Sequence, residues 1–110
     1  MVKHIPDRGD LIWLEFEPQK GKEIQKTRPA FVVSVKAYNE KTRLALCMPI
    51  TSHLKGYPFE VYIENEHIKG AILCDQIRSL DWVARNAQFI CKADAKIYAG
   101  IIAKFNTLIE

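Results

Sequence analysis

Residues 21–35, with the sequence GKEIQKTRPAFVVSV, join a charged, glycine-opened loop to an apolar segment that begins at Ala30. Arg28 therefore stands at the mouth of an expected strand. Pro29 lacks an N–H group and biases the residue before it towards extended geometry, so it suits the start of that strand. A planar guanidinium on a rigid edge is a bidentate binder of phosphate or carboxylate groups. The alternative is an arginine at a loop end that is only solvated.

The composition describes one globular domain over residues 1–110. Hydrophobic residues make up 48% and charged residues 26%, and 16 basic against 13 acidic residues leave a net charge of +3, which permits an anionic partner without demanding one. Cys47, Cys74 and Cys91 lie in apolar runs without metal-ligand spacing, so we expect reduced core residues of a cytoplasmic protein. We expect neither a signal peptide nor a membrane span, because long apolar stretches are absent from the sequence.

Short apolar segments bounded by turn residues predict strands at 11–16, 30–35, 44–50, 59–63, 71–77, 78–83 and 87–91. Residues 17–27 are expected to form a long exposed loop, and Pro49 is expected at a strand end or a sheet edge. From Ala93 to Ile109, apolar residues recur at three- and four-residue steps, which predicts an amphipathic helix with Asp94 at its N-cap. The fold class is therefore mainly β, a small, strongly curved antiparallel barrel with a C-terminal α-helix.

The second and third expected strands should pair as an antiparallel hairpin, because only the polar segment 36–43, with room for one helical turn, separates them. Pairing Val35 with Leu44 sets a register in which the numbers of facing residues add up to 79. Arg28 then faces Thr51 at the open end of the hairpin. A cation beside a hydroxyl makes a small oxyanion-binding pair, although a slip of one residue would turn every side chain to the other face.

Ordered motifs run through the chain from the first strand to the terminal helix. They are GDLIW at 9–13, FEP at 16–18, Gly21, Glu23, RP at 28–29, PITS at 49–52, KGYPFEV at 55–61, DQIRSLD at 75–81 and AR at 84–85. This set resembles the MazF/PemK toxins of bacterial toxin–antitoxin modules, and most closely the MazF branch. The resemblance implies an SH3-like barrel of the type that CcdB and MazF share, a homodimer, and a metal-independent endoribonuclease that cuts single-stranded RNA at short sequences. It also implies inhibition by a MazE-like antitoxin whose acidic tail occupies the RNA-binding groove.

The resemblance also assigns the candidate site residues. The family's important arginine and threonine map onto Arg28 and Thr51, the pair that the hairpin register brings together, and Glu23 matches a further position in the groove. The residues expected to contact RNA are Lys22, Ser52, His53, Lys55, Tyr57, Asp75, Gln76 and Arg78. The PemK branch carries an arginine two residues before the aspartate, where this chain has Leu73. The acid–base assignment proposed for PemK therefore does not transfer.

We expect neither a metal nor a cofactor, because RNA carries its own nucleophile. When the 2′-hydroxyl attacks the adjacent phosphorus, the protein supplies positioning, proton transfer and charge stabilisation, and the products are 2′,3′-cyclic phosphate and 5′-hydroxyl ends. Glu23 is the more natural proton acceptor, with Arg28 and Thr51 at the phosphorane oxygens. His53 is open to three interpretations, as a catalytic group, an RNA contact or an exposed side chain. Trp13 and Trp82 are expected in the core or at an interface.

Two other functions stay open at the level of sequence. A non-enzymatic toxin of the CcdB type shares the fold but acts on DNA gyrase through protein contacts, chiefly of its terminal helix. A harmless RNA-binding barrel would hold RNA without cutting it. Truncation of Arg28 or Thr51 separates the endoribonuclease from the CcdB-type toxin, because only an enzyme should lose its toxicity when either side chain is removed.

Overall fold

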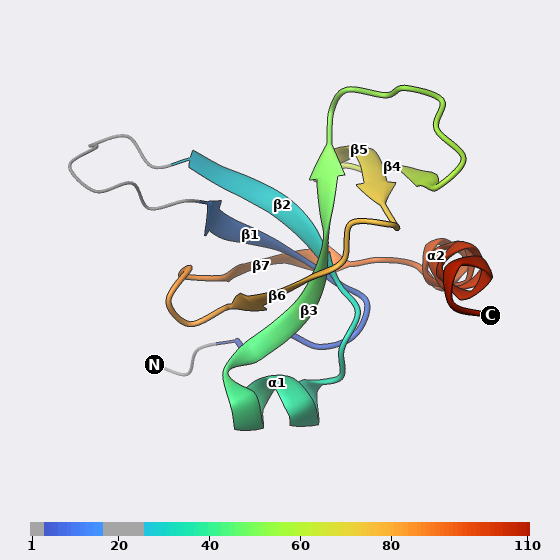
Figure 1. The fold of residues 1–110 in the computed structure, drawn as a ribbon. Coiled ribbons are helices and arrows are strands. Elements are labelled where there is room, and N and C mark those ends of the chain that lie inside the picture. The colour runs from blue at the N-terminus through green and yellow to red at the C-terminus, as the bar shows by residue number, and fades with distance from the viewer. Residues whose placement is uncertain (1–3, 17–25) are drawn as a thin grey trace.

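The structure is a computed structural model that describes residues 4–16 and 26–110, which form a strongly bent β-sheet and two helices (Figure 1). The strands are β1 (Asp10–Phe16), β2 (Lys26–Val32), β3 (Leu44–Thr51), β4 (Glu60–Glu64), β5 (Lys69–Leu73), β6 (Arg78–Asp81) and β7 (Gln88–Lys92). The helices are α1 (Lys36–Thr42) and α2 (Ala95–Ile109). The predicted fold class, mainly β with a C-terminal helix, is confirmed.

Strand β3 is the centre of the sheet, because it pairs with three other strands. The order is β4-β5-β3-β2-β1-β7, and β6 also pairs with β3. Residues 44–47 of β3 pair with β6, whereas Ile50 and Thr51 pair with β5. Pro49 lies where β3 changes from one neighbour to the other, and a residue without an N–H group is tolerated there. The prediction that Pro49 marks a strand end or a sheet edge is therefore wrong.

Alternation along β2 divides the core into two clusters. Phe31 belongs to a cluster with Ile72 of β5 and Ile101 of α2, whereas its neighbours Ala30 and Val32 belong to a second cluster with residues of β1, β3 and β6. This division follows from the geometry of a strand, in which successive side chains point to opposite faces. Both faces of the sheet are thus covered along much of β2.

The register predicted for the hairpin is confirmed where β2 and β3 pair. The facing pairs, whose numbers add up to 79, are Ala30 with Pro49, Phe31 with Met48, and Val32 with Cys47. Val35 precedes α1 and does not pair with Leu44 in this ladder, and Arg28 pairs with Leu14 of β1 instead. Arg28 and Thr51 therefore lie at the open end of the hairpin without forming a ladder pair.

Strand β2 covers Lys26–Val32 rather than the predicted residues 30–35. It begins earlier because residues 26–31 pair with β1, and Pro29 is tolerated because the ladder with β3 begins only after it. It ends earlier because Ser34 makes side-chain bonds that turn the chain into α1. The Ser34 hydroxyl donates to Asn39 Oδ1 at 2.5 Å and accepts from Leu46 N at 2.9 Å.

The remaining boundaries differ by smaller amounts. Strand β5 begins two residues early and ends at Leu73, so residues 74–77, predicted as strand, form the connection to β6. Strand β6 ends two residues before the predicted 83, and β4 and β7 are each shifted by one residue. Of the predicted loop 17–27, residues 17–25 lie outside the described part of the chain, and Lys26 and Thr27 belong to β2.

Helix α2 confirms the predicted cap and pattern. The Asp94 carboxylate accepts a hydrogen bond from Ile97 N at 3.0 Å, as an N-cap residue does, and the helix begins at Ala95 rather than at residue 93. Ile101 is fully buried against the first core cluster, whereas Ile109 is exposed at the end of the helix. The first part of the apolar stripe therefore packs on the sheet.

Candidate active site

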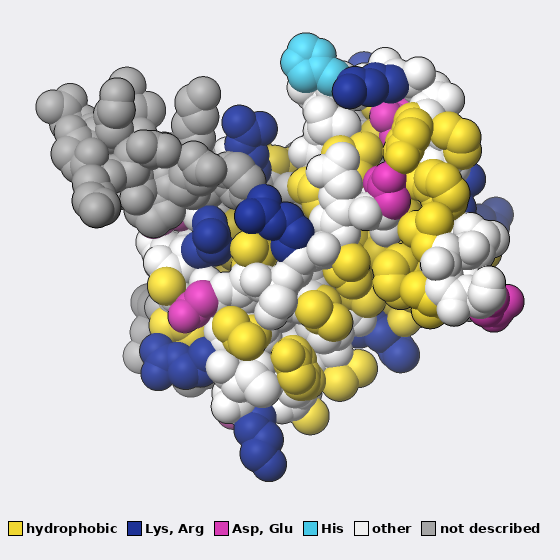
Figure 2. Space-filling model, in the orientation of Figure 1, with side chains coloured by type: hydrophobic (Ala, Val, Ile, Leu, Met, Phe, Trp, Pro, Cys, Tyr) yellow, Lys and Arg dark blue, Asp and Glu magenta, His cyan; other side chains and the backbone are white. Residues whose placement is uncertain are grey.

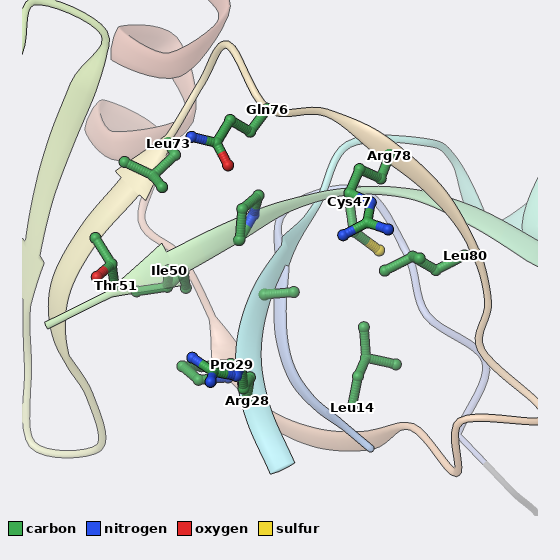
Figure 3. A pocket seen from close by; sticks show the side chains of 12 residues that line it. Leu14, Arg28, Pro29, Cys47, Ile50, Thr51, Leu73, Gln76, Arg78 and Leu80 are labelled. Carbon is green, nitrogen blue, oxygen red and sulfur yellow. The ribbon is translucent and has the colours of Figure 1, made fainter. Parts of the chain in front are cut away.

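An open cavity of about 250 Å³ lies where β2, the end of β3 and the segment after β5 come together (Figure 3). Its polar side chains are Arg28 from β2, Thr51 from β3, Gln76 from the β5–β6 connection and Arg78 from β6. Its apolar lining comprises Leu14, Pro29, Ala30, Cys47, Pro49, Ile50, Leu73 and Leu80. Three strands and one connecting segment thus place two arginines, a hydroxyl and an amide around one hollow, an arrangement suited to an anion.

The same face of the molecule carries several cationic side chains. In the space-filling view, Lys and Arg side chains border the notch between the start of β2 and the part of the molecule formed by β3, β4 and β5 (Figure 2). Such a grouping attracts a polyanion, since the positive potentials of neighbouring cations add.

Arg28 reaches the cavity because of its position in β2. Side chains alternate along a strand, so Arg28 shares a face with Ala30 and Val32, which belong to the second core cluster. Across the ladder it faces Leu14, which lines the same cavity. The cavity is therefore the open end of this core cluster, and Pro29 restricts the backbone next to the guanidinium.

Thr51 ends β3, and its hydroxyl has one acceptor site in use. Its Oγ1 accepts a hydrogen bond from His53 N at 3.1 Å. Because a hydroxyl is also a donor, this bond leaves the O–H group able to donate to a bound oxyanion. Gly70 of β5 packs closely on the same residue, since a Cβ atom at Gly70 would lie 2.6 Å from the Thr51 carbonyl oxygen. The backbone at Thr51 is thus held by its neighbour in the sheet.

A second cavity of about 170 Å³ adjoins the first and shares Thr51, Leu73 and Gln76 with it. Its other lining residues are His53, Lys55 and Tyr57 of the β3–β4 connection and Glu60 of β4. The two cavities together extend the site from the arginines towards this connection. We call them the groove.

Tyr57 and Asp75 tie the two segments that border the second cavity. The Tyr57 hydroxyl donates to Asp75 Oδ2 at 2.5 Å. This hydrogen bond to the carboxylate raises the pKa of Tyr57 above its ordinary value. Asp75 therefore holds Tyr57, and lines neither cavity of the groove itself.

Most of the residues predicted from the sequence meet in the groove. Those that line it are Arg28, Thr51, His53, Lys55, Tyr57, Gln76 and Arg78. Ser52 is exposed beside Thr51 and lines neither cavity. Lys22 and Glu23 lie outside the described residues, so their predicted roles are carried forward as proposals.

Sequence analysis missed the apolar part of the site, formed by Leu14, Cys47, Leu73 and Leu80. The alternation of each strand marks these residues as apolar, but it does not say which of them line a cavity at the surface. Cys47 is buried, and this burial raises its pKa to about 12, so it is a neutral thiol at physiological pH. All three cysteines are free, as predicted.

The three histidines are exposed and differ in their surroundings. His53 lines the second cavity, beside the candidate site. His4 Nε2 lies 2.8 Å from Oδ2 of the buried Asp10, whose Oδ1 is 2.6 Å from Lys92 Nζ. His67 Nε2 lies 3.1 Å from a carboxylate oxygen of the preceding glutamate. His4 and His67 are therefore surface residues outside the candidate site.

Within residues 4–16 and 26–110, no three His, Cys, Asp or Glu side chains are grouped so that they could hold a metal ion. Among the helices described here, none has the length and apolar character needed to cross a bilayer. Fold and site together define a small protein with a bent antiparallel sheet, a C-terminal helix and an arginine-lined groove with donors suited to an anion.

Comparison with known proteins identifies the family. Residues 7–109 match the model of the PemK-like, MazF-like toxins of type II toxin–antitoxin systems, and the chain belongs to this family. It is 44% identical to the endoribonuclease toxin MazF of Escherichia coli (strain K12) over 107 residues, which cover 97% of this chain and 96% of that protein. Endoribonuclease PemK of Escherichia coli is 29% identical, over 94% of this chain and 81% of that protein.

Solved structures of relatives have the same fold. MazF from Deinococcus radiodurans superposes with a TM-score of 0.85 at 42% identity, over 97% of this chain and 98% of that one. A MazE–MazF complex from the same organism contains a chain that superposes with a TM-score of 0.87 at 39% identity, over 97% of both chains. The predicted family is confirmed, and the relatives named as endoribonucleases agree with the prediction of an enzyme.

Proposed function

We propose that this chain is a metal-independent endoribonuclease toxin that cuts single-stranded RNA at specific short sequences. The observation that carries the proposal is the meeting of Arg28 and Thr51, with Gln76 and Arg78, around one open cavity. Guanidinium, hydroxyl and amide groups supply the donors that bind phosphate, and an open groove admits a flexible single strand. The names of the relatives, which are endoribonuclease toxins, support the same reaction.

The reaction uses the 2′-hydroxyl of RNA as its nucleophile. The 2′-oxygen attacks the adjacent phosphorus and gives its proton to a base, while the bond from phosphorus to the 5′-oxygen breaks and that oxygen takes up a proton. The products are a 2′,3′-cyclic phosphate and a 5′-hydroxyl end. The protein has only to position the phosphate, move protons and stabilise charge. Our candidate for the base is the carboxylate of Glu23.

Arg28 and Thr51 stabilise the charge that develops at phosphorus. The guanidinium of Arg28 neutralises the phosphorane oxygens through charge-assisted hydrogen bonds, and one of its N–H groups supplies the proton that the leaving oxygen takes up. Thr51 donates its O–H to a non-bridging oxygen, and the bond that it accepts from His53 N orients the hydroxyl for this role. The loss of one such donor typically slows catalysis about a hundred- to a thousandfold.

We further propose that the protein acts in the cytoplasm as a homodimer, and that a MazE-like antitoxin with an acidic, flexible tail inhibits it by covering the groove. The cationic groups of the groove, Arg28, Arg78 and Lys55, attract such a tail in the way they attract RNA. The MazE–MazF complexes of Deinococcus radiodurans support a partner of this kind.

The test is to incubate the purified protein with a long single-stranded RNA in excess chelator and to map the cut ends. We expect discrete cuts that share a short sequence and carry 2′,3′-cyclic phosphate and 5′-hydroxyl ends. Arg28→Ala and Thr51→Val should each slow cleavage about a hundred- to a thousandfold. Thr51→Ser keeps the hydroxyl and should retain most of the activity.

Matched controls lie on the helices, away from the groove. Lys41→Ala on α1 removes one exposed positive charge, and Thr107→Ala on α2 removes one exposed hydroxyl, so both should cut RNA at the wild-type rate. Intact RNA under these conditions, with the protein still toxic to growing cells, overturns the proposal and points to a protein target such as DNA gyrase. If the RNA binds with an affinity that falls as the salt concentration rises but stays uncut, the protein is a non-enzymatic RNA-binding barrel.

A further inference from the structure

A third cavity of about 200 Å³, which shares no lining residue with the groove, has the composition of a nucleobase site. It is lined by Trp13, Glu15, Thr27, Asn86 and Gln88. Proteins recognise single-stranded RNA by stacking its bases on aromatic side chains and by hydrogen bonding to the base edges. An indole, two amides, a carboxylate and a hydroxyl supply both kinds of contact. We call this cavity the Trp13 pocket.

Trp13 is exposed although its neighbours in β1 are buried. Its exposed fraction is 38%, against 0% for Ile12 and 2% for Leu14. The ladders place Trp13 beside Gln88 of β7, and Glu15 beside Thr27 of β2. Alternation puts Trp13 and Glu15 on the same face of the sheet, so these four side chains border one hollow.

One wall of the Trp13 pocket is held in place by hydrogen bonds to β1. Glu15 N donates to Arg85 O at 2.8 Å, and Arg85 Nη1 donates to Glu15 O at 3.2 Å. Asn86, with a left-handed backbone (φ 56°), donates from Nδ2 to Glu15 Oε2 at 3.1 Å. Polar groups that are fixed before binding lose less conformational entropy when a ligand arrives.

We propose that the Trp13 pocket is a second RNA subsite, which stacks one nucleobase that carries an exocyclic amino group. The proposal rests on the function proposed above. The Glu15 carboxylate only accepts hydrogen bonds, so it matches the amino group of adenine or cytosine and not the carbonyl oxygen that uracil presents there, whereas the amides of Asn86 and Gln88 can pair with either kind of base edge. The volume is below the roughly 300 Å³ at which pockets for larger ligands begin, which suits a single base.

The Trp13 pocket lies near the groove along the chain. Thr27 and Arg28 are consecutive in β2, and alternation sends one side chain to the pocket and the other to the groove. An RNA strand with a phosphate at Arg28 therefore has to pass only across β2 to bring a nearby base to Trp13. The pocket would add sequence preference at a nucleotide outside the cleaved bond.

Trp13 itself reports on binding. Oligonucleotides with 2′-O-methyl groups lack the nucleophile, so binding is measured without cleavage. Titration with 2′-O-methyl oligoadenylate or oligocytidylate should quench the emission of Trp13, and oligouridylate should do so more weakly. The other indole, Trp82, is 6% exposed and its Nε1 donates to Asn39 O at 2.9 Å, so it should give a constant background.

Variants separate a role in binding from a role in folding. Trp13→Leu should weaken binding of the same oligonucleotides roughly five- to a hundredfold by fluorescence anisotropy, and Trp13→Phe, which keeps an aromatic ring, less so. Glu15→Ala should reduce the preference for adenine and cytosine over uracil, because the Glu15 carboxylate only accepts hydrogen bonds. Tyr38→Leu on α1 is the control, because Tyr38 is 40% exposed and lies outside both sites, and it should bind as the wild type does.

Unchanged affinity in a folded Trp13→Leu variant overturns the proposal. A Trp13 emission maximum that shifts with protein concentration, but not with added RNA, also overturns the proposal. Such a shift would place Trp13 between two copies of the chain instead. These results are distinct from failure of the proposed function. A protein that binds the oligonucleotides through Trp13 but leaves cleavable RNA intact refutes only the nuclease, and a nuclease that is indifferent to Trp13 refutes only this subsite.

Discussion

Replacing Asn39 with alanine should lower the free energy of unfolding by about 3 kcal/mol. Asn39 is 0% exposed. Its Nδ2 donates to Pro6 O at 2.8 Å and to Ser34 O at 3.0 Å, and its Oδ1 accepts from the Ser34 hydroxyl at 2.5 Å. Each bond contributes about 1 kcal/mol net, and partners left buried without a bond add to the cost. In a domain of this size the melting temperature should fall by roughly 10–15 °C.

The measurement is urea unfolding followed by circular dichroism. An m-value equal to that of the wild type would show that the substitution leaves the unfolded state unchanged. Asn106→Ala on α2 removes an exposed amide and should change stability by less than about 0.5 kcal/mol. Asn39→Asp removes both N–H donors and buries a charge, so its deficit relative to the wild type should shrink as the pH falls and the carboxyl group protonates. A cost below about 1 kcal/mol for Asn39→Ala would refute this reasoning.

Three further predictions concern the site and the thiols. Gly70→Ala should slow RNA cleavage and destabilise the sheet, because its Cβ atom would lie 2.6 Å from the Thr51 carbonyl oxygen. Gly100→Ala is the control and should do neither, because the space around its Cβ atom is open. Cleavage rates and melting temperatures of the two variants test this prediction. A thiol titration of the native protein at pH 8 should modify Cys91 first and Cys47 last, because burial raises the pKa of Cys47 from 9.0 to about 12 and the thiolate is the reactive form. Stability should then fall as the pH rises from about 9 towards 12, since the unfolded chain gives up the Cys47 proton first, and Cys47→Ala should reduce this slope.

Elements governed by local chemistry were predictable. The N-cap at Asp94 and the apolar steps after it define α2 without reference to the rest of the chain. The register between β2 and β3 was predictable because the two strands are close in sequence and alternate with a period of two. The ends of β2 were not, because Pro29 lies inside the strand only when β1 pairs with it and β3 does not.

The candidate site was predictable in part. Arg28 and Thr51 came together through the hairpin register and through the resemblance to the family, and both line one cavity. Asp75 lines neither cavity of the groove and accepts a hydrogen bond from the Tyr57 hydroxyl, so its predicted contact with RNA stays a prediction. Trp13 was expected in the core or at an interface, and it lines an exposed pocket.

The amino-acid sequence by itself determined the family, the mainly β class with its terminal helix, and the types of group available for binding an anion. Only the tertiary structure decided which side chains share a cavity. Both faces of β1 and β2 carry apolar residues, so their patterns look alike in sequence. Which positions stay open depends on where α2, β3 and β6 stop covering the sheet, and that is set by contacts between residues far apart in the chain.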